Sequence, residues 1–136
     1  MPQHDKPLFF VGIDWAATEH AVCVLDQTGR KIAAFTIDHT AAGFSRLATR
    51  LGKLAQPEQI PVAIERPDGR LVDTLLEAGY PVLPVKPTAI KSWREAEVLS
   101  GAKSDPGDAH VIADYLRVRI HRLRPAAPLS GPTKAL

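Results

Sequence analysis

The 136-residue sequence lacks the features that mark several classes of protein. It holds a single cysteine, Cys23, which excludes an internal disulfide framework and a multi-cysteine zinc site. No apolar run approaches the ~20 residues that span a bilayer, and the first ten residues, MPQHDKPLFF, lack the pattern of a signal peptide. With 45% apolar and 24% charged residues, the composition is that of a globular protein. We therefore expect a cytoplasmic protein with no membrane contact.

Positive charge is concentrated in the C-terminal part of the sequence. Residues 1–85 hold 8 Lys and Arg against 10 Asp and Glu, a balance of −2, whereas residues 86–136 hold 9 against 5, a balance of +4. Such a patch suits phosphate backbones, although basic side chains also stabilise helix ends. Trp93 and Tyr115 lie on apolar helical faces, so we expect them to pack in the core rather than to stack on bases. The residues expected to contact nucleic acid are Lys86, Lys91, Arg94, Lys103, Arg117, Arg119, Arg122 and Arg124.

Short apolar runs separated by turn residues predict five strands. The turn that contains Gly29 predicts a hairpin, and the short link WAATE predicts that the first two strands are antiparallel neighbours. Two prolines in YPVLPV place the last strand at a sheet edge, because proline cannot donate to a strand ladder. The predicted strands are residues 8–14, 20–26, 31–37, 61–65 and 80–85.

Helical spacing of apolar residues predicts four helices between and after these strands. Thr40 is predicted to cap the first, and Asp68 to cap a second that stops at Gly79. A third passes through Trp93, and a fourth begins within KSDPGDAHVIADYL (103–116).

The order of these elements predicts an α/β fold. Three sequential antiparallel strands followed by alternating strands and helices give a mixed five-stranded sheet with helices on both faces. That is the order of the ribonuclease H-like fold. We expect residues 1–124 to form this domain. The proline-rich residues 125–136 are expected to form a linker or the truncated start of a following segment.

Two carboxylates end apolar strands. Asp14 closes LFFVGID and Glu65 closes PVAIE. If these strands are parallel and adjacent, both side chains emerge at one sheet edge, about 5 Å apart, where ligands bind in open α/β sheets. Two anions that close repel each other unless a proton or a metal ion lies between them. As alternatives, Asp14 could begin a turn and Glu65 could pair with a nearby arginine.

Two further acids, Asp105 and Asp108, lie at the start of the last predicted helix. Asp105 followed by Pro106 suits an N-cap and first helical position, which puts Asp108 at the third position, so capping alone could explain both acids. Helical spacing, however, places Asp108 in the middle of an apolar stripe with Val111 and Tyr115. An unpaired carboxylate there is costly. We therefore expect a positive group to face Asp108.

Four carboxylates without a Cys/His cluster favour a hard cation such as Mg²⁺ or Mn²⁺. Two such ions, ~3.5–4 Å apart, would stabilise both the attacking and the leaving oxygen in phosphodiester chemistry.

Three blocks of the sequence, GIDWA (12–16), AIERPDG (63–69) and KSDPGDA (103–109), resemble the motifs of the DEDD transposases of bacterial insertion sequences, specifically the insertion-sequence one-hundred-and-ten family. The resemblance runs over residues 8–124. It implies a RuvC-like nuclease domain, similar to Holliday-junction resolvases, whose catalytic and metal-binding acids are Asp14, Glu65, Asp105 and Asp108.

The same resemblance implies the partners. Family members are bacterial recombinases that act on DNA and are directed by a structured bridge RNA, and we expect the full-length protein to be a homo-oligomer. They continue into a helical segment and a C-terminal domain with a nucleophilic serine. Ser130 lies in the proline-rich tail and does not match that serine. Complete recombination is therefore not expected from these residues alone.

Two other interpretations stay open. One is half of a sugar-kinase or actin-like ATPase, but its phosphate loop needs glycines and WAATEH contains none. The other is a non-catalytic RNA- or DNA-binding module, in which the acids only cap helices. A divalent-metal titration separates this module from an enzyme.

Overall fold

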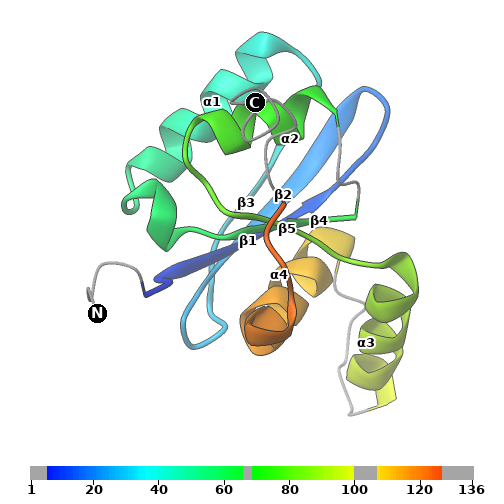
Figure 1. Ribbon diagram of the computed structural model, residues 1–136. Helices are drawn as coiled ribbons and strands as arrows, with labels where there is room; N and C mark the ends of the chain where they lie inside the picture. Colours follow the sequence, from blue (N-terminus) through cyan, green and yellow to red (C-terminus); the bar gives the residue numbers. More distant parts are fainter. Residues whose placement is uncertain (1–5, 66–68, 100–106, 127–136) are drawn as a thin grey trace, which may run out of the picture.

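The computed structural model describes residues 6–65, 69–99 and 107–126 of the chain. These residues form one five-stranded sheet in the order β3-β2-β1-β4-β5, with α1 and α2 on one face and α3 and α4 on the other (Figure 1). In chain order the strands and helices are β1 (Phe9–Asp14), β2 (Glu19–Asp26), β3 (Lys31–Asp38), α1 (Ala41–Gly52), β4 (Val62–Ile64), α2 (Arg70–Glu77), β5 (Val82–Pro84), α3 (Pro87–Leu99) and α4 (Asp108–Arg119). Short 3-10 turns, η2 (Pro57–Gln59) and η3 (Ile120–Arg122), precede β4 and follow α4.

The strand pairing confirms the predicted mixed sheet. β1 and β2 are antiparallel, as are β2 and β3, whereas β4 is parallel to both β1 and β5. β5 lies at one edge, as its prolines predict. There the backbone N–H of Ala126 donates to the carbonyl of Val82 at 2.7 Å, so the chain follows the sheet edge as far as residue 126.

Local sequence signals set the helix ends. The Thr40 hydroxyl accepts a hydrogen bond from the backbone N–H of Gly43 at 3.0 Å and caps α1 as predicted. Gly79 has a φ of +95°, a conformation that glycine adopts without strain, and it ends α2 where expected. α2 begins after Gly69 rather than after an Asp68 cap, and residue 68 lies outside the described residues.

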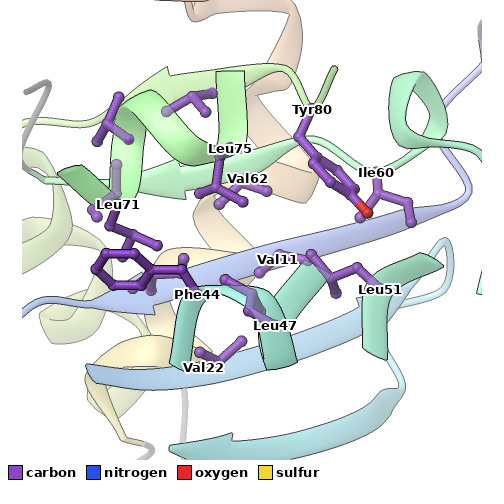
Figure 2. Packing of buried hydrophobic residues seen from close by; sticks show 14 of the residues in the cluster. Val11, Val22, Phe44, Leu47, Leu51, Ile60, Val62, Leu71, Leu75 and Tyr80 are labelled. Carbon is purple, nitrogen blue, oxygen red and sulfur yellow. The ribbon is translucent and has the colours of Figure 1, made fainter. Parts of the chain in front are cut away.

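The main core lies between the sheet and the α1/α2 layer. Figure 2 shows Leu47 and Leu51 of α1 directed at Val11 of β1, beside Leu75 of α2. All four side chains are buried. Smaller clusters on the other face pack α4 against β1, β2 and β4. Within the described residues, no helix is long and apolar enough to cross a membrane.

Candidate nuclease site at the carboxyl edge of the sheet

Asp14 and Glu65 lie side by side at the carboxyl ends of β1 and β4. The parallel register pairs Gly12 with Ala63 and Ile13 with Ile64, and the next residue along each chain is Asp14 and Glu65, respectively. Both acids lie on the α3/α4 face, because side chains alternate along a strand and Gly12 contacts α4. The sheet therefore brings together the first two predicted acids.

Burial and mutual repulsion make this pair of acids costly to ionise. Partial burial raises the pKa of Asp14, and the nearby Arg94 guanidinium opposes that rise. Burial also raises the pKa of Glu65, and the negative charge of Asp14 raises it further. Each acid is more easily charged when a cation lies close by.

Asp108 begins α4 rather than occupying its third position. Gly107 has extended backbone angles (φ −63°, ψ 157°) and takes the N-cap place, and its carbonyl accepts the first helical hydrogen bond, from Val111 at 3.1 Å. The predicted cap residue Asp105, together with Lys103, lies outside the described residues. The predicted start of the helix at Pro106 is therefore two residues too early.

The Asp108 side chain is 52% exposed and does not point into the core, contrary to the prediction. α4 packs closely on the sheet at Gly12. A Cβ on Gly12 would lie 2.3 Å from the carbonyl oxygen of Ala109 and 2.4 Å from the backbone nitrogen of Ala113. The backbone of α4 therefore lies directly on β1. Ala109 and Ala113 are buried together with Val111, Ile112 and Leu116, whereas Asp108 is the first residue of the helix, where a side chain leans beyond the helix end.

The positive group that was expected to face Asp108 is Arg94 of α3. The two side chains form an ion pair, and Arg94 is 24% exposed. Asp14 and Asp108 also border one hollow of about 510 Å³ between the start of α4 and β2–β3, with Cys23, Lys31 and Thr36 among its other lining residues. Asp108 thus lies at the same sheet edge as Asp14.

The oxygen ligands that these acids offer are of the kind that a hard cation prefers. Carboxylate oxygens are the ligands that Mg²⁺ and Mn²⁺ prefer, and the Asp14–Glu65 pair supplies them at one edge. Among residues 6–65, 69–99 and 107–126, however, no three His, Cys, Asp or Glu side chains gather closely enough to hold a metal ion. Asp108 is instead held by Arg94.

The predicted nucleic-acid contacts fall into two groups. Lys86 and Lys91 are exposed near the start of α3, whereas α4 carries its arginines away from the acids, so that Arg117 lies about 14 Å farther along the helix axis. Arg117 pairs with Asp114 at 2.9 Å, and the Arg119 guanidinium lies 5.3 Å from the Trp93 ring centroid.

Arg122 and Arg124 are exposed beyond the end of α4. Trp93 and Tyr115 form an edge-to-face pair with ring centroids 5.5 Å apart, and both pack on the apolar cluster beneath α4, as expected. The four arginines of residues 117–124 therefore differ in their freedom to reach a phosphate.

A pair of histidines shapes the turn that follows Asp14, which sequence inspection missed. His20 is fully buried and its Nδ1 accepts a hydrogen bond from the Ala16 N–H at 3.1 Å. Its Nε2 therefore carries the proton and donates to Nδ1 of His39 at 2.9 Å. Trp15 stacks on His20 with ring centroids 4.3 Å apart. The sequence pattern that could have predicted the burial of His20 is its alternation with Val22 and Val24 on one face of β2.

Comparison with solved structures identifies the fold. RuvC of Thermus thermophilus, in a structure described as a complex with a Holliday junction substrate, superposes with a TM-score of 0.58 at 18% identity, over 87% of this chain and 99% of that one. Another T. thermophilus RuvC structure gives a TM-score of 0.53 with the same identity and coverage. Likeness at this identity shows the RuvC-like, ribonuclease H-like fold and no more.

Sequence comparison identifies the family. A protein of Streptomyces coelicolor named as the mini-circle transposase for IS117 is 38% identical over 123 residues, which cover 89% of this chain and 30% of that protein. A protein of Sinorhizobium fredii named as transposase y4uE is 36% identical over 116 residues, which cover 83% of this chain and 32% of that protein. The chain thus spans about a third of the length of these relatives. The model of the DEDD transposase family of IS110, described as a transposase, matches residues 11–136, and the chain belongs to this family.

Proposed function

We propose that this chain is the divalent-metal-dependent nuclease domain of a DNA transposase that also acts as a recombinase. The observation that carries the proposal is the adjacency of Asp14 and Glu65 at the carboxyl edge of two parallel strands, with Asp108 at the same edge. Family membership and the RuvC-like fold support it.

In this proposal the carboxylates of Asp14, Glu65 and Asp108 hold Mg²⁺ or Mn²⁺, and Asp105 completes the set. A divalent ion bound there would lower the pKa of a water nucleophile and offset charge on the phosphate. Burial of Asp14 and Glu65 contributes by weakening competition from water at the two carboxylates. The α4 contact at Gly12 fixes the distance of Asp108 from β1.

The proposed substrate is DNA, and the structural neighbour described with a Holliday junction favours branched DNA. Exposed basic side chains, Lys86 and Lys91 near the start of α3 and Arg122 and Arg124 beyond the end of α4, suit contacts to phosphate. We propose strand transfer guided by a bridge RNA, a homo-oligomeric state and use of a nucleophilic serine for the whole protein. The chain spans only about a third of the length of the relatives.

The test is strand cleavage by this 136-residue chain. End-labelled four-way junctions and linear duplexes of the same sequence are incubated with the chain in Mn²⁺ and, separately, in EDTA. We expect nicks in Mn²⁺ with the wild type, none in EDTA and none with Asp14→Asn. Asp73→Asn, an exposed acid on α2 at the opposite face, serves as the matched control and should cleave like the wild type. DNA binding with neither a nick nor Mn²⁺ binding would favour the non-catalytic module, whereas Mn²⁺ binding without a nick would assign cleavage to the serine proposed for the whole protein.

A further inference from the structure

Arg94 of α3 acts on two acids of the candidate site at once. Its guanidinium forms an ion pair with Asp108 of α4, and its charge also acts on Asp14 at the end of β1. Three elements that are distant in the sequence thus share one cation. Residues 94 and 108 lie on different helices, so this pairing depends on the tertiary fold rather than on helical spacing.

A guanidinium and a divalent ion would compete for the same oxygen atoms. The Arg94 guanidinium presents a fixed fork of N–H donors to these oxygen atoms. A magnesium ion needs carboxylate oxygens at about 2.0–2.1 Å, and its two positive charges repel a guanidinium at the same carboxylates. Metal binding to Asp108 therefore requires that Arg94 move away.

A second arginine–aspartate pair on the same helix shows what a purely structural pair looks like. Asp114 accepts a hydrogen bond from Arg117 at 2.9 Å and another from Nε1 of Trp93 at 3.1 Å. That carboxylate is satisfied by fixed partners and lies two turns away from the acidic edge. Asp108, by contrast, is half exposed and borders the same hollow as Asp14.

We propose that Arg94 is a resident counter-cation that holds Asp108 in the metal-free domain and is exchanged for the divalent ion when the metal site assembles. The proposal rests on the proposed function, because it assumes that Asp14 and Asp108 bind a metal. Arg94 is then a positioning residue: it keeps Asp108 ordered before the metal arrives and sets the concentration of metal at which the site fills.

The test is a calorimetric titration of Mn²⁺ without nucleic acid, at fixed pH and ionic strength. Arg94→Met removes the charge and keeps most of the apolar stem of the side chain, which protects the packing of α3. Arg94→Lys keeps the charge but loses the forked donor geometry. Arg46→Met, on the exposed side of α1, makes the same change of charge far from the acids and serves as the matched control.

We expect Arg94→Met to bind Mn²⁺ roughly two- to fivefold more tightly than the wild type, since a partly exposed ion pair is worth little more than this factor. The Mn²⁺ affinity of Arg94→Lys should lie between those of Arg94→Met and the wild type, and the Mn²⁺ affinity of Arg46→Met should equal that of the wild type. Equal or weaker Mn²⁺ binding by Arg94→Met would overturn the exchange. Asp14→Asn keeps the two proposals distinguishable. If Asp14→Asn abolishes Mn²⁺ binding while Arg94→Met leaves it unchanged, the metal site stands and the exchange fails.

Discussion

The two faces of the sheet differ in the kinds of side chain that cover them. The α1/α2 face packs leucine, isoleucine and valine side chains into one continuous cluster, and the buried His20 alternates along β2 with Val22 and Val24 of that cluster. The α3/α4 face has smaller apolar clusters, a glycine where the helix backbone lies on β1, and the charged groups Asp14, Glu65, Arg94 and Asp108 at its edge. One face thus stabilises the domain, and the other positions ionised groups that cost stability.

The largest expected effect tests the stabilising face. Leu47 of α1 is fully buried in the main cluster, so Leu47→Ala should lower the free energy of unfolding by about 2–5 kcal/mol. The stabilisation that Mn²⁺ adds should be unchanged, because Leu47 lies on the α1/α2 face whereas the acids of the candidate site lie on the α3/α4 face. Urea unfolding with and without Mn²⁺ measures both quantities. Loss of the Mn²⁺ response in a folded Leu47→Ala variant would contradict the separation of the two faces.

Gly12→Ala should lower the free energy of unfolding by a smaller amount, and it tests the close contact between α4 and β1 on the α3/α4 face. The added methyl meets the backbone of Ala109 and Ala113, so α4 must move outward at a cost of about 1–3 kcal/mol. Because Asp108 moves with the helix, Mn²⁺ affinity should fall as well. Gly52→Ala is the control, since a Cβ there meets nothing within 4 Å. Equal behaviour of the two alanine variants would show that α4 does not lie on β1 in solution.

Lowering the pH should reduce the free energy of unfolding through protonation of His20. Burial lowers the pKa of His20 below its usual 6.5, and His39 lowers it further. The unfolded chain therefore binds a proton at this histidine more readily than the folded chain does. The contribution of neutral His20 to the free energy of unfolding is thus fully present above pH 6.5. It is lost as the pH falls through the lower folded-state pKa, by at most about 1.4 kcal/mol per pH unit.

The unfolding free energy measured between pH 7 and 5 should fall less steeply in His20→Asn than in the wild type. His121→Asn, at an exposed position of η3, should retain the wild-type slope. Identical slopes for His20→Asn and the wild type would remove His20 from this account.

The smallest effect has the opposite sign and belongs to the α3/α4 face. Burial and Asp14 raise the pKa of Glu65, so its ionised form destabilises the metal-free domain above its unfolded-state pKa, and increasingly so as the pH rises to its folded-state pKa. Glu65→Gln should therefore stabilise the metal-free domain at pH 7, by about 0.5 kcal/mol, because solvent screens a partly exposed carboxylate. Thermal unfolding in EDTA measures the change. Glu77→Gln, at an exposed position of α2, is the control, and a destabilised Glu65→Gln variant would contradict the repulsion.

Local patterns predicted most of the fold. Thr40 and Gly79 marked helix ends correctly, the prolines marked the edge strand, and the apolar runs that end in Asp14 and Glu65 proved to be adjacent parallel strands. The start of α4 was misplaced by two residues, because Gly107 rather than Asp105 takes the N-cap place.

The orientation of Asp108 and the role of Arg94 were beyond the sequence. Asp108 is exposed because it is the first residue of α4, although Val111 and Ile112 on the same side of the helix are buried, and a helical wheel does not show where a helix begins. Arg94 resembled other basic residues of its segment, and only the packing of α3 beside α4 shows that it faces Asp108 rather than solvent alone. Pairings between distant elements depend on tertiary geometry that no local pattern contains.

The most direct test of the metal site is a calorimetric titration of Mn²⁺ into the wild-type chain and into Asp14→Asn. A cation that lies between Asp14 and its neighbours should bind the wild type with a heat of binding that saturates, and it should raise the melting temperature as the Mn²⁺ concentration increases. Asp14→Asn should show neither effect, while remaining at least as stable as the wild type in EDTA, because burial raises the pKa of Asp14 in the metal-free domain. Equal Mn²⁺ binding by the two proteins would contradict the account.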